Sequence, residues 1–116
     1  MSNMTSEQFV SCIRKELLEM NLSMYMAEMD GSGGVHWPRL KAFYTRLDDI
    51  SRQDLSFAIR QVMVDTISNL LGILDGSSLL NEYRDEFHLR YDGDSKDLNG
   101  QLQDLFLEAE EIRNRK

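Results

Sequence analysis

The sequence predicts a mostly helical α+β domain of about four helices, with a short strand or hairpin between the last two. Apolar residues recur every three or four positions along most of the chain, and they alternate with polar residues only over residues 82–91. The chain has 116 residues, and 41% of them are hydrophobic, which is enough to form one core. We therefore predict a single domain over residues 1–116.

The first helix is marked by Thr5 and Gln8, which have the spacing of a capping box. Cys12 in this helix is interpreted as a small buried residue and not as a nucleophile. Three glycines form a flexible connection after the helix. The apolar stripe of the helix is Phe9, Ile13, Leu17, Met20 and Met24, and the glycines are Gly31, Gly33 and Gly34.

Pro38, the only proline, fits the first turn of a second helix, because its missing N–H costs nothing there. Ser51 and Asp54 form a second capping signal, which opens the longest periodic segment, and Gly76 ends that segment. The predicted buried side of the second helix is Leu40, Phe43, Tyr44 and Leu47.

The long third helix is apolar on most sides, as expected of a central helix. Its polar positions fall on one narrow stripe, which is either the solvent edge of a core helix or a small polar groove used for binding. The stripe consists of Asp65, Ser68, Asn69 and Gly72.

Residues 83–91 alternate apolar and polar side chains except at Asp85, which falls on the apolar side, and this is the pattern of a half-buried strand. A single strand needs a partner for its backbone groups. The partner is the segment 77–81, the segment around Val35, or a strand from another chain. Asp92 and Gly93 then form a turn, and the last helix runs from about Leu98.

Acidic residues outnumber basic ones and give a net charge of −7. Such a surface repels nucleic-acid phosphates and anionic lipid, so neither is a predicted partner. Eleven of the acidic residues lie between Asp75 and Glu111. They form either an ordinary solvated surface or a docking face for a basic protein. One cysteine, no signal peptide and no uninterrupted apolar span of membrane length favour the cytoplasm.

No pattern of catalytic, metal-binding or cofactor-binding residues stands out. His36 and His88 have no second ligand at metal-binding spacing, and His88 is interpreted as simply exposed. The acids at positions 92, 94 and 97 do not fit a calcium loop, because Lys96 occupies a ligand position. A turn followed by a helix cap explains them better. We predict no enzyme, no cofactor and no metal site.

Three segments of the second half resemble small acidic bacterial proteins, some of which serve as immunity proteins in polymorphic and contact-dependent toxin systems. The resemblance covers about residues 60–108 and is carried by residues 70–76 (LLGILDG), 87–91 (FHLRY) and 98–106 (LNGQLQDLF). It implies an inhibitor that covers the cationic cleft of a toxin, for example of a basic nuclease domain. It carries over no individual binding residue.

The predicted partner-binding residues come from the density of acids around the expected strand. They are Asp85, Glu86, Asp92, Asp94 and Asp97, with Tyr91 as an aromatic anchor. The alternative function is a regulatory or structural module that forms a homodimer through the lone strand or the apolar central helix.

Overall fold

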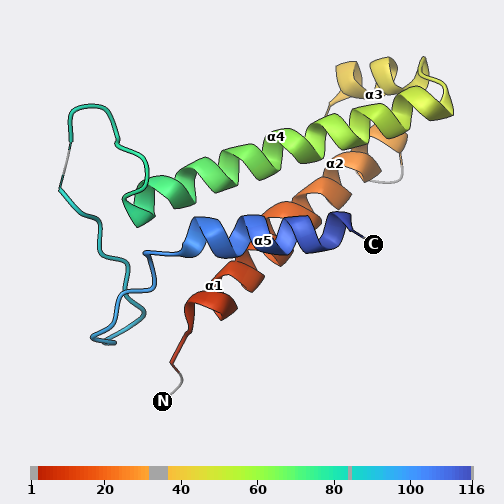
Figure 1. Cartoon of the computed structure of the whole chain (residues 1–116). Coiled ribbons are helices and arrows are strands. Elements are labelled where there is room, and N and C mark those ends of the chain that lie inside the picture. Colours follow the sequence, from red (N-terminus) through yellow and green to blue (C-terminus); the bar gives the residue numbers. More distant parts are fainter. Residues whose placement is uncertain (1–2, 32–36, 84, 116) are drawn as a thin grey trace. The chain divides into compact units, whose positions relative to one another are not determined.

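The computed structural model describes residues 3–31, 37–83 and 85–115, which form four helices (Figure 1). The first covers residues 6–30 and consists of α1 (Ser6–Ile13), the π-helical segment η1 (Arg14–Glu19) and α2 (Met20–Asp30). The others are α3 (Pro38–Thr45), α4 (Asp49–Asp75) and α5 (Leu102–Asn114). The prediction of a mostly helical chain with about four helices is confirmed.

The prediction of a strand or hairpin between the last two helices is wrong. Residues 86–91 have no regular secondary structure, and the described residues form only one isolated bridge, between Leu80 and Tyr83. Of the proposed strand partners, the segment 77–81 contributes Leu80 to this bridge, and Val35 lies outside the described residues. The loop between α4 and α5 is held instead by side chains that bond to its backbone groups.

The chain divides into two compact units. Unit 1 consists of Met1–Arg14 and Asp65–Lys116, and unit 2 is Lys15–Val64. In unit 1, α1 packs against α5. Arg14 and Glu110 form a largely buried ion pair there, with 3.2 Å between Nη2 and Oε1, and the Arg14 guanidinium lies 5.4 Å from the centre of the Phe106 ring. The buried apolar side chains of unit 1 are Val10, Leu71, Leu98, Leu102 and Phe106.

The predicted start of the first helix is confirmed at atomic detail. The Thr5 hydroxyl accepts the backbone N–H of Gln8 at 3.0 Å, and the Gln8 side chain accepts the backbone N–H of Thr5 at 2.9 Å. The next residue, Ser6, donates its hydroxyl to the carbonyl of Leu98 at 2.7 Å. The expectation for Cys12 is wrong: it is exposed, because it lies on the side of α1 away from the buried Val10.

The polar stripe of the long helix is partly covered by α5. Ser68 and Gly72 are buried, whereas Asp65 and Asn69 are exposed. The side-chain amide of Gln103 donates to the Ser68 carbonyl at 3.0 Å and to its hydroxyl at 3.2 Å. This stripe is therefore a helix-packing surface at two of its positions and a solvent edge at the other two.

Unit 2 contains α2, α3 and the first part of α4. Helix α2 packs against α3, and the rings of Tyr25 and Trp37 stack with their centres 4.8 Å apart. Arg60 forms two hydrogen bonds of 2.9 Å with the Glu19 carboxylate. The expected buried side of the second helix is wrong for two of its residues, since Leu40 and Phe43 are exposed in this short, two-turn helix.

Two helix ends lie where the sequence predicted them, whereas the start of α4 differs from the prediction. Helix α3 begins at Pro38 and α4 ends before Gly76, whose φ of 84° is left-handed, as predicted. The expected capping role of Ser51 is wrong, because α4 begins at Asp49 and the Asp48 carboxylate accepts the N–H of Ser51 at 2.8 Å. This hydrogen bond lowers the pKa of Asp48. Gly33 and Gly34 lie outside the described residues.

Helix α4 is long and apolar enough to cross a membrane when only its length and composition are considered. Only a minority of its most apolar 18-residue window is buried. One helix of this length and composition is weak evidence, so the finding by itself assigns no membrane role to α4.

Replacing Thr5 with alanine is expected to lower the free energy of unfolding by about 0.5–2 kcal/mol, because the N–H of Gln8 loses its acceptor. Thr5→Ser keeps the hydroxyl and serves as the control. Chemical denaturation of the three proteins checks this, and equal stability of the alanine variant and the parent would contradict it.

Gly72 leaves the space that Gln103 occupies. A Cβ added at Gly72 would lie 2.8 Å from Gln103 Oε1, so Gly72→Ala forces Gln103 away from Ser68. In a Gln103→Ala background this conflict disappears, and the same substitution gains the helix propensity of alanine, about 1 kcal/mol. A double-mutant cycle is therefore expected to show that Gly72→Ala is less favourable in the parent than in the Gln103→Ala protein. Additive effects would show that the side chains do not compete for this space.

Candidate functional site

The loop of residues 76–101 joins α4 to α5, and its two ends are fixed by one carboxylate. Asp75, the last residue of α4, accepts the N–H of Gly100 at 2.6 Å through Oδ1 and the N–H of Gln103 at 2.7 Å through Oδ2. The N-cap residue of α5, Gln101, makes no side-chain cap hydrogen bond. Asp75 therefore serves as the cap of α5 from the end of the preceding helix.

Asn99 holds the middle of the loop against the end of α4. Its amide nitrogen donates to the carbonyls of Leu74 and Phe87, and its amide oxygen accepts the N–H of Leu89 at 2.8 Å. The N–H of Leu98 donates to the Leu89 carbonyl at 2.7 Å. These side-chain and loop contacts satisfy backbone groups that a second strand would otherwise pair with.

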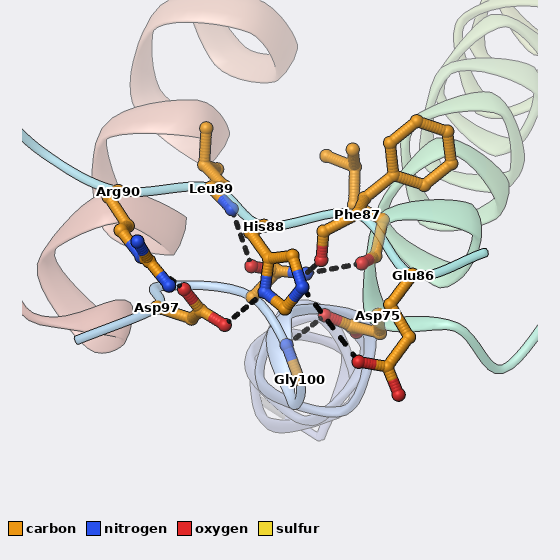
Figure 2. A network of polar contacts seen from close by, with 10 residues as sticks. Asp75, Glu86, Phe87, His88, Leu89, Arg90, Asp97 and Gly100 are labelled. Carbon is orange, nitrogen blue, oxygen red and sulfur yellow. Dashed lines mark hydrogen bonds and ion pairs between the residues drawn. The ribbon is translucent and has the colours of Figure 1, made fainter. Parts of the chain in front are cut away.

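The Asp97 carboxylate bonds to two side chains of the same loop, the titratable His88 and the cationic Arg90 (Figure 2). Its Oδ2 lies 2.7 Å from His88 Nδ1, and its Oδ1 accepts Arg90 Nε at 2.8 Å. Hydrogen bonds from His88 and then from Arg90 lower the pKa of Asp97. A lowered pKa means that the fold stabilises the ionised carboxylate. The pairing therefore adds stability above about pH 4, where an unpaired aspartate is ionised, and this stability is lost as the pH falls through the lowered pKa.

A hollow of about 380 Å³ lies within unit 1, between the end of α4 and this loop. Its lining combines carboxylates with aromatic rings. Tyr83 is 70% exposed and Phe87 is 45% exposed, so both rings present apolar area to solvent. We call this cavity the loop hollow, and its lining includes Asp75, Tyr83, Asp85, Glu86, Phe87 and His88.

The predicted partner-binding residues are distributed over the loop and do not form one patch. Asp85, Glu86 and Asp97 line the loop hollow. Asp94 and Asp97 line a second hollow of similar size, together with Glu7 and Lys96. Tyr91 and Asp92 line neither. Residues 91–94 form the expected turn, in which the N–H of Asp94 donates to the Tyr91 carbonyl at 2.9 Å and Asp92 has a φ of 26°.

The acids of residues 92–97 do not cap α5, contrary to expectation. That role belongs to Asp75, and α5 begins at Leu102 and not near Leu98, which is a buried loop residue. Asp97 is committed to His88 and Arg90 within the chain. Within the described part of the chain, Asp85 has neither a hydrogen bond nor an ion pair, and the side chain of Glu86 is 83% exposed.

Sequence reasoning missed four residues that organise this site. His88 is exposed, as expected, but its ring is also paired with Asp97. The two-residue spacing of His88 and Arg90 was a usable signal, since extended backbone places such residues on one side. No sequence signal identified Asp75 or Asn99, because their partners lie 10 to 28 residues away along the chain.

The chemistry of the loop hollow suits a cationic side chain. Carboxylates accept hydrogen bonds from lysine or arginine, and exposed rings attract cations by their π faces. Among the described residues, no group of three or more His, Cys, Asp or Glu side chains is arranged to hold a metal ion.

No protein-family model, curated protein or solved structure matches this chain.

Asn99→Asp tests the role of Asn99, because it removes both amide donors and keeps the acceptor for Leu89. We expect the free energy of unfolding to fall by about 1–3 kcal/mol, with faster hydrogen exchange at the amides of Leu89 and Leu98. Ser95→Asp adds the same charge to an exposed position of the same loop and serves as the control. If both variants exchange at the parent rate, the loop does not depend on Asn99.

Proposed function

We propose that this chain binds a basic protein partner through the loop hollow. The observation that carries the proposal is the pair of neighbouring carboxylates Asp85 and Glu86, both exposed at a cavity that also contains the exposed rings of Tyr83 and Phe87. Carboxylates speed the approach of a basic partner, and aromatic side chains supply the contacts that hold it.

The distribution of charge supports the same surface. Unit 1 contains thirteen acidic and seven basic residues, whereas unit 2 contains seven and six. The negative potential therefore originates almost wholly from the unit that contains the loop hollow. A basic protein is attracted to this unit, and attraction of this kind weakens as salt is added.

The specific form of the proposal is an immunity protein that neutralises a bacterial toxin by covering its cationic active-site cleft. It rests on the resemblance of residues 60–108 to small acidic immunity proteins and on the charge of unit 1. An inhibitor of this kind acts in the cytoplasm of the cell that it protects and requires no catalysis of its own.

The test compares the parent with Asp85→Lys/Glu86→Lys as bait in the native organism, followed by binding measurements with the recovered purified protein. We expect a basic partner whose affinity falls by about tenfold or more in the variant, mainly through slower association. The control is Asp104→Lys/Glu108→Lys, which makes the same change of charge at exposed positions of α5 outside the hollow. Equal losses in both variants would assign the effect to net charge alone. Full affinity in the loop variant would exclude the loop hollow.

A second candidate function is a homo-oligomeric module, and one observation favours it. Unit 2 has an apolar hollow of about 370 Å³ lined by Tyr25 and four α4 residues, and one of these, Val62, is 65% exposed. Sedimentation of the parent and of Val62→Glu over a range of concentrations distinguishes this candidate. A concentration-dependent mass that Val62→Glu abolishes would support it. The other α4 residues are Ala58, Ile59 and Met63.

A further inference from the structure

His88 lies between two carboxylates at the edge of the loop hollow (Figure 2). Its Nδ1 is 2.7 Å from Asp97 Oδ2, and its Nε2 is 3.9 Å from Glu86 Oε2. The His88 side chain is 51% exposed, so it exchanges protons directly with solvent. One nitrogen of the ring is therefore fixed by Asp97, and the other faces the carboxylate that our proposed function offers to a partner.

The other charged groups around the ring have separate commitments. Arg90 occupies the second oxygen of Asp97, and the Asp75 carboxylate accepts backbone N–H groups at the start of α5. Asp85 lines the loop hollow beside Glu86, and the titratable Tyr83 lines it as well. Beyond Asp97, the second hollow contains Glu7, Asp94 and Lys96. Glu86 is thus the carboxylate that faces Nε2.

We propose that the protonation of His88 regulates the loop hollow by competing with the partner for Glu86. The inference rests on the proposed function. Protonated His88 directs an N–H from Nε2 towards Glu86 and pairs with it, so the chain itself supplies the cation. In neutral His88 the Nδ1–H donates to Asp97, and the lone pair of Nε2 points towards Glu86. The Glu86 carboxylate is then available to a lysine or arginine of the partner.

The change in charge gives the direction of the effect. Histidine is the side chain that changes its charge between about pH 5 and 8. Above about pH 5.5 ordinary carboxylates are almost wholly ionised, so protonation of the ring changes the pair of His88 and Glu86 from a net charge of −1 to zero. Binding of a basic group therefore weakens on acidification. By linkage, the bound cation also disfavours the protonated form of His88, and binding releases a proton.

The first test uses the free protein and needs no partner. The carboxylate ¹³C resonance of Glu86 is followed from about pH 6 to 8 in the full chain, above the ordinary titration range of a glutamate. We expect it to shift in step with the protonation of the His88 ring and to stay constant in His88→Gln. His36→Asn, at the only other histidine, serves as the control and keeps the shift. A constant Glu86 resonance in the parent would overturn the inference, whatever the protein binds.

The second test uses a hexa-arginine peptide as a defined basic probe at constant ionic strength. We expect the parent to bind it about two- to fivefold more weakly at pH 5.5 than at pH 7.5, the factor that one exposed ion pair contributes. His88→Gln and Glu86→Gln are expected to show no such change, and His36→Asn to show all of it. An unchanged pH dependence in His88→Gln would overturn the inference. Binding that is insensitive to Asp85→Lys/Glu86→Lys would instead contradict the proposed function, and the inference with it.

Discussion

The Asp75 carboxylate is the contact on which the rest of unit 1 depends. It occupies the last position of α4 and accepts two N–H groups at the start of α5, so the end of one helix completes the beginning of the next. A long loop between two helices loses conformational entropy when its ends are brought together, and this contact fixes those ends. The buried Leu102 and Phe106 lie in the helix that begins at this contact, and Asp75 also lines the loop hollow.

Signals that act within a few residues were readable in the sequence. The capping box of Thr5 and Gln8, the proline at the start of α3 and the left-handed glycine after α4 each depend only on neighbouring backbone groups. Apolar periodicity located the helices but not the width of their buried sides. For this reason the pattern indicated burial of Leu40, Phe43 and Cys12, although all three are exposed.

The expected strand failed for a specific physical reason. Alternation between residues 83 and 91 shows which side chains face the same way in extended backbone, but a strand also requires a neighbour for its backbone groups. Here Asn99 takes that place: it bonds to Phe87 and Leu89 through a single side chain. A contact of this kind is invisible to periodicity, because any asparagine in the loop could have made it.

The sequence could indicate the region of the candidate site but not which of its side chains lie together. The density of acids indicated the loop, and the fold brings Asp85 and Glu86 to one hollow. It gave no means of separating these from Asp97, which is neutralised by its own neighbours, or from Asp92, which shapes a turn. Counts of charge describe the potential of a surface, whereas the groups that remain available depend on pairings fixed by the fold.

The loop owes its shape to a few polar side chains that bond to backbone, and Leu98 is the one buried apolar side chain among its described residues. Backbone groups are the same in every amino acid, so most side chains of residues 76–97 can be exchanged without removing these supports. Substitutions in the loop therefore leave the helices intact as long as these supports remain. A lineage that kept Asp75 and Asn99 could therefore change many of the other side chains of this surface without having to evolve a new scaffold.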